Sequence, residues 1–161
     1  MSMTFTEEQD EFRKSVRRFL EQKSSSADVR RLMETDEGYD PGVWQQMAEQ
    51  LGLQGLALPE EYGGSGFGFI EQIAVLEEMG RALLCAPYFS SVVLAGTALV
   101  QSGDDAAKRD LLTGIADGST IATLAWVENP TEWGMGSLST TTRISDAVCP
   151  SSASVFVPSI M

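Results

Sequence analysis

The sequence of 161 residues contains no histidine. Histidine is the commonest general base in enzymes and the commonest protein ligand of transition metals, so these residues cannot form a Ser-His triad, a Cys-His dyad or a histidine metal site. The two cysteines, Cys85 and Cys149, lie far apart and form no CxxC motif. Two cysteines so placed are typical of reduced thiols that are buried or without function, in a reducing compartment, rather than of a disulfide framework.

Basic residues are also scarce, with 11 Lys and Arg against 23 Asp and Glu and a formal net charge of −12. The deficit is uneven, because residues 24–80 carry two basic and eleven acidic side chains. Such a surface repels nucleic acids and anionic membranes, so we expect neither as a partner. A small anionic ligand stays open, since local backbone dipoles can outweigh net charge.

Long apolar runs are absent as well, and no segment reaches the roughly 20 apolar residues of a transmembrane helix. Met1-Ser2-Met3-Thr4 leads directly into a charged segment, unlike a signal peptide, so we expect a cytoplasmic protein. Hydrophobic residues make up 43% of the chain and charged residues 21%, which is enough apolar material for a core. The length fits one full domain and part of a second.

Helical periodicity and capping residues predict helices along the first 118 residues. Thr4 or Thr6, with Glu7 or Gln9 three residues later, is typical of a capping box at the first helix. We expect Asp28 to cap a second helix.

The first helix carries a basic cluster with two interpretations. The cluster is either a site for a negatively charged partner or a solvated face balanced by nearby acids, and we prefer the second interpretation. Its members are Arg13, Lys14, Arg17 and Arg18, and the nearby acids are Glu7, Glu8, Asp10, Glu11 and Glu21.

The segment from residue 40 to residue 68 has the clearest sequence signals for a helix start, a helix end and a turn. Asp40-Pro41 predicts a helix start and Gly52 a helix end, and Trp44 on that helix is more often a core residue than a ligand contact. Residues 59–68 form a glycine-rich turn without the Lys-Ser/Thr of a phosphate-binding loop. Its glycines indicate positive φ angles and close backbone packing.

Three further helices are expected before residue 118. Residues 69–81 have an apolar stripe of Phe69, Ile73, Leu76 and Gly80, which we expect to face the core. Ser90 is expected to cap a helix that is apolar almost all round, and such a helix is normally central in a bundle. Residues 104–115 have the pattern of another amphipathic helix, which residues 116–119 close.

The character of the sequence changes after Ser119. Residues 120–127 are rich in branched and aromatic side chains and predict a buried strand, and the Thr-rich residues 138–143 predict a second one. The predicted fold class is therefore mainly α: an up-down helical bundle over residues 1–118, then the first strands of a β domain over residues 119–143. Residues 144–161 contain one charged side chain and form an atypical tail, which we expect to be out of frame or disordered.

Four pieces of the chain together resemble the acyl-CoA dehydrogenase family. They are Thr6-Glu7-Glu8-Gln9 opening a helix, residues 44–66, Leu76-Glu77-Glu78-Met79-Gly80-Arg81, and residues 103–118 leading to a strand with Glu128. Their order and spacing are similar to the N-terminal helical domain of that family and its passage into the middle β domain. The bundle is accordingly expected to be of the acyl-CoA dehydrogenase type.

The resemblance implies a flavoprotein oxidoreductase of fatty acid metabolism, which desaturates an acyl-CoA thioester between its α and β carbons. In this family a carboxylate removes the α proton and FAD accepts the β hydrogen as hydride. The resemblance places FAD contacts at Leu124, Trp126, Val127, Gly136 and Ser137, although Trp126 and Val127 fit strand core equally well. It places acyl contacts at Phe89, Ser90 and Val93, of which Val93 also fits bundle core.

The resemblance assigns no catalytic residue to this sequence, because the family's catalytic glutamate lies in a C-terminal helical domain that nothing here matches. It therefore implies a truncated chain that is inactive alone and that forms homo- or hetero-oligomers with dehydrogenase-like chains. One alternative is a non-catalytic subunit of a heteromeric dehydrogenase, which fits Val127 standing where the family commonly has Thr and Asn129 inserted before Pro130. The other is a helical protein-interaction domain.

Overall fold

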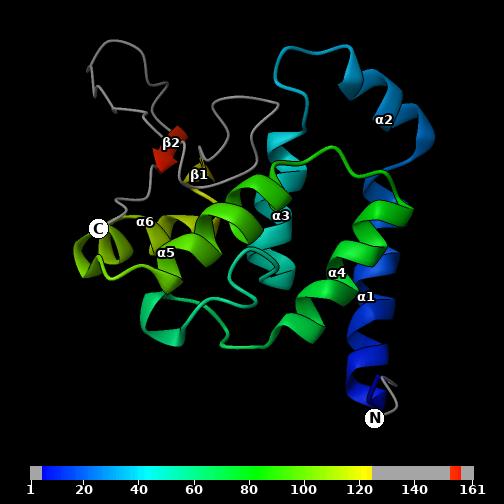
Figure 1. The fold of residues 1–161 in the computed structure, drawn as a ribbon. Helices are drawn as coiled ribbons and strands as arrows, with labels where there is room; N and C mark the ends of the chain where they lie inside the picture. Colours follow the sequence, from blue (N-terminus) through cyan, green and yellow to red (C-terminus); the bar gives the residue numbers. More distant parts are fainter. Residues whose placement is uncertain (1–4, 125–152, 157–161) are drawn as a thin grey trace, which may run out of the picture.

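The computed structural model describes residues 5–124 and the strand at residues 153–156, and these residues form a mainly helical fold (Figure 1). This arrangement confirms the predicted fold class. The elements are α1 (Glu7–Lys23), α2 (Ser26–Met33), α3 (Pro41–Leu51), the 3₁₀ helix η1 (Glu60–Tyr62), α4 (Phe69–Arg81), the π-helix η2 (Phe89–Gly96), α5 (Thr97–Gln101), α6 (Asp105–Asp117), β1 (Ile121–Leu124) and β2 (Ala153–Phe156).

The helix ends follow local capping chemistry. Thr6 and Gln9 form the capping box of α1, as predicted. The prediction that Asp28 caps α2 is wrong. Ser25 is the N-cap, and the Asp28 side chain, three residues later, accepts a hydrogen bond from the Ser25 amide to complete a capping box. Asp40 caps α3, and Gly52 ends it in the left-handed region at φ 60°, as the sequence predicts.

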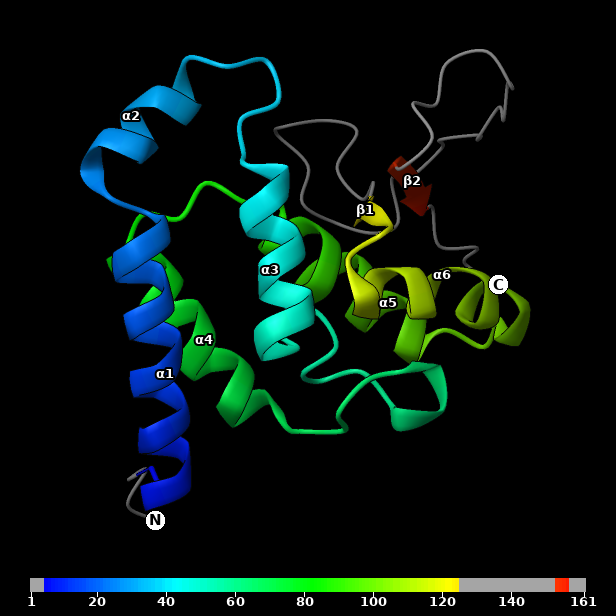
Figure 2. The ribbon, with the colours of Figure 1, turned by 180° about the vertical axis from the view of Figure 1, so that it is seen from behind.

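The helices pack around a shared apolar core. The two opposite views show α1 and α4 side by side (Figures 1 and 2), and α3 packs against α6. Trp44 is a core residue, as expected, and its Nε1–H donates to the Gly118 carbonyl at 2.8 Å. The largest side chains that are almost completely buried include Tyr88, Leu20, Met47, Leu53, Leu99, Leu112 and Ile115.

The glycine-rich turn after η1 is held against the chain that precedes it. Gly63 and Gly66 have φ angles of 82° and 66°, and a Cβ at Gly64 would collide with the Leu58 carbonyl. The amide of Phe67 donates to the Leu56 carbonyl at 3.0 Å. These glycines therefore allow positive φ angles and close backbone packing, as predicted.

The buried face of α4 differs from the prediction. Phe69 and Ile73, which we expected in the core, are 60% and 50% exposed. The opposite face carries the buried residues Gln72, Ala74, Val75, Glu78 and Met79. Periodicity identifies an apolar stripe but cannot say which neighbour covers it, and α1 packs on the other side of the helix.

The helix after residue 87 begins before Ser90, so Ser90 does not cap it. The Ser90 hydroxyl instead donates to the Pro87 carbonyl at 3.1 Å from inside the helix. Ser91, Val92 and Ala95 are buried, which confirms the expected central position of this helix. Residues 89–96 have the wider π-type turn, a form that is rare and often found at functional sites.

A short strand follows the helices. β1 covers residues 121–124 of the strand predicted at 120–127, and it pairs in parallel with β2 in the register Ile121 with Ala153. The remainder of that predicted strand and the one at 138–143 lie outside the described residues. In the portion that the structure describes, no helix is long and apolar enough to cross a membrane.

Candidate functional site

An apolar cleft lies where α4 ends and the next helix begins. Its volume is about 270 Å³, and no charged side chain lines it. The lining residues come from the last turns of α4, the connector and the start of η2: Leu76, Met79, Gly80, Leu83, Leu84, Ala86, Tyr88 and Phe89. Such a surface suits the hydrocarbon part of a ligand, because it offers area to bury and few polar partners.

The connector is fixed by a tight helix end. The Leu84 amide donates to the Met79 carbonyl at 3.0 Å and the Leu83 amide to the Gly80 carbonyl at 3.1 Å. Leu83 has a φ of 50°, which is a strained backbone conformation for a leucine. Its side chain is 69% exposed, and Leu83 lines the cleft two residues after α4 ends.

Tyr88 supplies a wall of the cleft without supplying a polar group to it. Its side chain is buried and its hydroxyl donates to the Leu53 carbonyl at 3.0 Å. Burial raises the pKa of the Tyr88 phenol well above its ordinary value, so the group stays neutral. The ring therefore contributes apolar surface.

The structure brings one of the three predicted acyl contacts to the cleft. Phe89 lines it and is 57% exposed. Ser90 and Val93 follow on η2, where both are half-buried and neither belongs to the lining, and Val93 packs against the core. Their assignment to acyl contact stays a prediction.

Only one of the five predicted FAD contacts lies in the described residues. Leu124 is half-buried at the end of β1. Trp126, Val127, Gly136 and Ser137 lie outside the described residues, so the FAD assignment stays a prediction.

Sequence reasoning missed a buried carboxylate, Glu78, which is 1% exposed. Three guanidinium groups contact it: Arg13 Nε at 2.8 Å, Arg17 Nη2 at 2.7 Å and Arg81 Nε at 2.7 Å. The hydrogen bonds from Arg17, Arg81 and Arg13 hold the pKa of Glu78 far below its usual range, against the opposing effect of burial.

The interpretation of the basic cluster as a solvated face is therefore wrong for Arg13 and Arg17, which tie α1 to α4. The signal was present in the sequence, because these two arginines are four residues apart and lie on one helix face. Arg13 and Arg17 already have carboxylate partners, since both contact Glu78 and Glu77 also contacts Arg13 at 2.8 Å.

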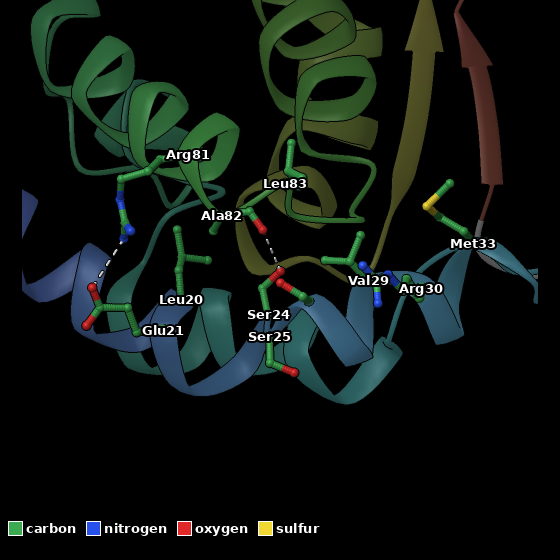
Figure 3. A pocket seen from close by; sticks show the side chains of 11 residues that line it. Leu20, Glu21, Ser24, Ser25, Val29, Arg30, Met33, Arg81, Ala82 and Leu83 are labelled. Atoms are coloured by element: carbon green, nitrogen blue, oxygen red, sulfur yellow. Dashed lines mark hydrogen bonds and ion pairs between the residues drawn. The ribbon is translucent and has the colours of Figure 1, made fainter.

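A larger groove of about 470 Å³ lies between the end of α1, α2 and the end of α4 (Figure 3). Several of its polar groups already serve the fold: Ser24 Oγ donates to the Ala82 carbonyl at 3.1 Å, and Arg81 pairs with Glu21 and Glu78. Figure 3 shows the Ser24–Ala82 and Arg81–Glu21 contacts among the lining residues. No set of polar groups converges there for chemistry, and the described residues contain no metal-binding cluster of His, Cys, Asp and Glu.

The residues that the structure describes form a helical fold with an apolar cleft between α4 and η2. The family model described as "Acyl-CoA dehydrogenase, N-terminal domain" matches residues 6–119. The chain therefore belongs to the acyl-CoA dehydrogenase family, which confirms the resemblance.

Curated relatives agree with this assignment. Acyl-CoA dehydrogenase IpdE2 of Mycolicibacterium smegmatis is 36% identical over 121 residues, which are 75% of this chain and 37% of that protein. The mitochondrial isovaleryl-CoA dehydrogenase of Pongo abelii is 32% identical over 129 residues, covering 76% of this chain and 29% of that protein. The chain thus spans about a third of the length of the relatives it matches.

Solved structures show the same fold. The ChsE4-ChsE5 complex from Mycobacterium tuberculosis matches with a TM-score of 0.73 and 30% identity, over 82% of this chain and 36% of that one. A G363A variant of the Tcur3481-Tcur3483 steroid ACAD matches with a TM-score of 0.67 and 33% identity, over 74% of this chain and 32% of that one.

Proposed function

We propose that this chain supplies the helical wall of the acyl site in an FAD-dependent acyl-CoA dehydrogenase, which desaturates acyl-CoA thioesters. The observation that carries the proposal is the exposed Phe89 ring beside a cleft without charged lining, in a chain of this family. Phe89, Ser90 and Val93 contact the acyl group. FAD, with Leu124, Trp126, Val127, Gly136 and Ser137 as its contacts, supplies the redox chemistry when bound.

No described residue is proposed as the catalytic base. Glu78 is held ionised by three guanidiniums, and a carboxylate with so low a pKa is a weak base. Glu60 and Glu61 are exposed on η1, away from the residues that line the cleft. We therefore expect the 161-residue chain to bind an acyl group but to be silent in catalysis.

Two measurements on the purified chain test this function. The first is the visible spectrum after gel filtration with FAD, where a co-eluting flavin band supports a retained cofactor site. The second is a dye-reduction assay with octanoyl-CoA and FAD, in which we expect no turnover. Turnover by the chain alone would contradict the expected lack of catalytic activity. Failure to bind any acyl-CoA would overturn the proposal that this chain supplies part of the acyl site.

A second candidate is a non-catalytic subunit of a two-chain dehydrogenase. It is favoured by the match to the ChsE4-ChsE5 complex and by the exposed apolar face of α4, with Phe69, Ile70 and Ile73 each at least half exposed. A large exposed apolar patch usually marks an interface. Co-expression with a longer dehydrogenase chain should then give a co-eluting pair, and the double substitution Phe69→Glu with Ile73→Glu should separate it.

A further inference from the structure

We infer that the cleft between α4 and the start of η2 receives the hydrocarbon end of the acyl group, and that Gly80 sets how large that end is allowed to be. The inference rests on the proposed function and adds a size-determining residue on α4. It concerns a different helix from the one that carries Phe89, Ser90 and Val93.

The lining excludes a polar or charged ligand end. Leu76, Met79, Leu84 and Ala86 contribute apolar side chains, and the Tyr88 hydroxyl is turned to the Leu53 carbonyl. A carboxylate or hydroxyl in this cleft would lose its water without gaining a side-chain partner. A hydrocarbon end has no polar group to desolvate. Its binding removes apolar area of both the ligand and the cleft from water.

Gly80 leaves space where a side chain would otherwise stand. It lines the cleft, and a Cβ built on it meets no atom within 4 Å. Gly96, on the neighbouring helix, differs because its Cβ would lie 3.3 Å from the Leu58 side chain, as a packing glycine requires. Gly80 therefore serves no packing contact in the described residues, and helix formation alone would favour a larger residue there.

The size of the cleft indicates the size of the ligand end. Its volume is about 270 Å³. A water molecule takes up about 30 Å³ in the liquid, so the cleft is larger than the space of a single small group. Leu83 and Phe89, both mostly exposed, extend the apolar surface at its rim.

The test is a titration of the purified 161-residue chain, labelled at its leucine methyl groups, with octanoyl-CoA and with acetyl-CoA, followed by NMR. The variants Gly80→Leu and Gly80→Ala add a large and a small side chain at this exposed lining position. Gly103→Leu is the matched control, because a Cβ there also meets no atom within 4 Å and Gly103 does not line the cleft. Melting temperatures of all variants show whether the fold is kept.

We expect octanoyl-CoA to bind more tightly than acetyl-CoA and to shift the methyl signals of Leu76 and Leu84. Gly80→Leu should raise the Kd of octanoyl-CoA about tenfold or more and leave the Kd of acetyl-CoA unchanged. Gly80→Ala should have an intermediate effect on the Kd of octanoyl-CoA. Gly103→Leu should bind both thioesters like wild type. Octanoyl-CoA binding that Gly80→Leu leaves unchanged would overturn the role of Gly80 while the proposed wall stands. Absence of binding by either thioester would overturn both.

Discussion

At the scale of single residues, Glu78 has the most unusual environment among the described side chains. It is 1% exposed and receives hydrogen bonds from Arg13, Arg17 and Arg81. Burial opposes its charge, but the three guanidiniums outweigh that effect and keep the pKa low. The arginines are 28–43% exposed, so the cluster is partly hydrated and lies between a surface pair and a fully buried one.

We expect Glu78→Gln to lower the free energy of unfolding by about 2 kcal/mol, between the values for exposed and buried ion pairs. The amide leaves three guanidiniums without their shared anion and can satisfy only part of their donors. Urea unfolding at neutral pH measures the loss. The control is Glu77→Gln, whose side chain is 49% exposed and forms a single ion pair, with Arg13, among the described residues, and we expect a loss of less than about 1 kcal/mol there. Equal losses in the two variants would contradict the cluster's role.

The same carboxylate gives a pH dependence. The folded-state pKa of Glu78 is lowered from 4.5, so its contribution to stability is complete above about pH 4.5 and is lost as the pH falls toward the lower folded value. Wild type should therefore lose its advantage over Glu78→Gln progressively below pH 4.5. Urea midpoints for both chains from pH 7 to pH 3 measure this difference. A constant gap across that range would show that Glu78 does not titrate as the structure requires.

At the scale of elements, capping residues predicted where most helices begin and end. Thr6, Asp40, Gly52 and Gly118 act within one or two turns of their own helix, so their roles follow from the local sequence. Side-chain periodicity was less reliable. It placed Phe69 and Ile73 of α4 in the core, whereas the neighbouring helix α1 covers the face with Val75 and Glu78.

A pair of substitutions on α4 tests which face is buried. Val75 is 1% exposed, and Val75→Ala should cost about 2 kcal/mol through lost transfer energy and a residual cavity. Ile73 is 50% exposed, and Ile73→Ser should change stability by no more than about 0.5 kcal/mol in the isolated chain. Chemical denaturation of both variants measures the order. The reverse order would support the face that periodicity predicted.

At the scale of the whole molecule, one hydrogen bond joins the helical part to the strand that follows it. The Ala122 amide donates to Ser91 Oγ at 3.1 Å, and both residues are buried. Ser91 lies inside the π-helix, so the same helix carries the cleft residue Phe89 and holds β1. The position of β1 is therefore tied to the helix that carries the cleft residue Phe89.

We expect Ser91→Ala to cost about 1–3 kcal/mol, because it leaves the Ala122 amide buried without a partner. Hydrogen exchange at Ala122 should also become faster. Ser90→Ala is the matched control, since among the described residues the Ser90 hydroxyl bonds the nearby Pro87 carbonyl, just before η2, and Ser90 is half-buried. An unchanged exchange rate at Ala122 in Ser91→Ala would rule out this link between helix and strand.

The sequence by itself determined the helical class, most helix ends, the purpose of the turn glycines and the family, because each depends on residues close together in the chain or on a pattern along it. Only the tertiary structure decided which face of α4 is buried, that Arg13 and Arg17 share Glu78 with Arg81, and that Gly80 and Phe89 meet at one cleft. The first two features depend on α1, whose Arg13 and Arg17 lie 65 and 61 residues before Glu78, and the third depends on how the connector after α4 folds back. Packing between helices sets them, and local periodicity carries no information about which neighbour covers a face.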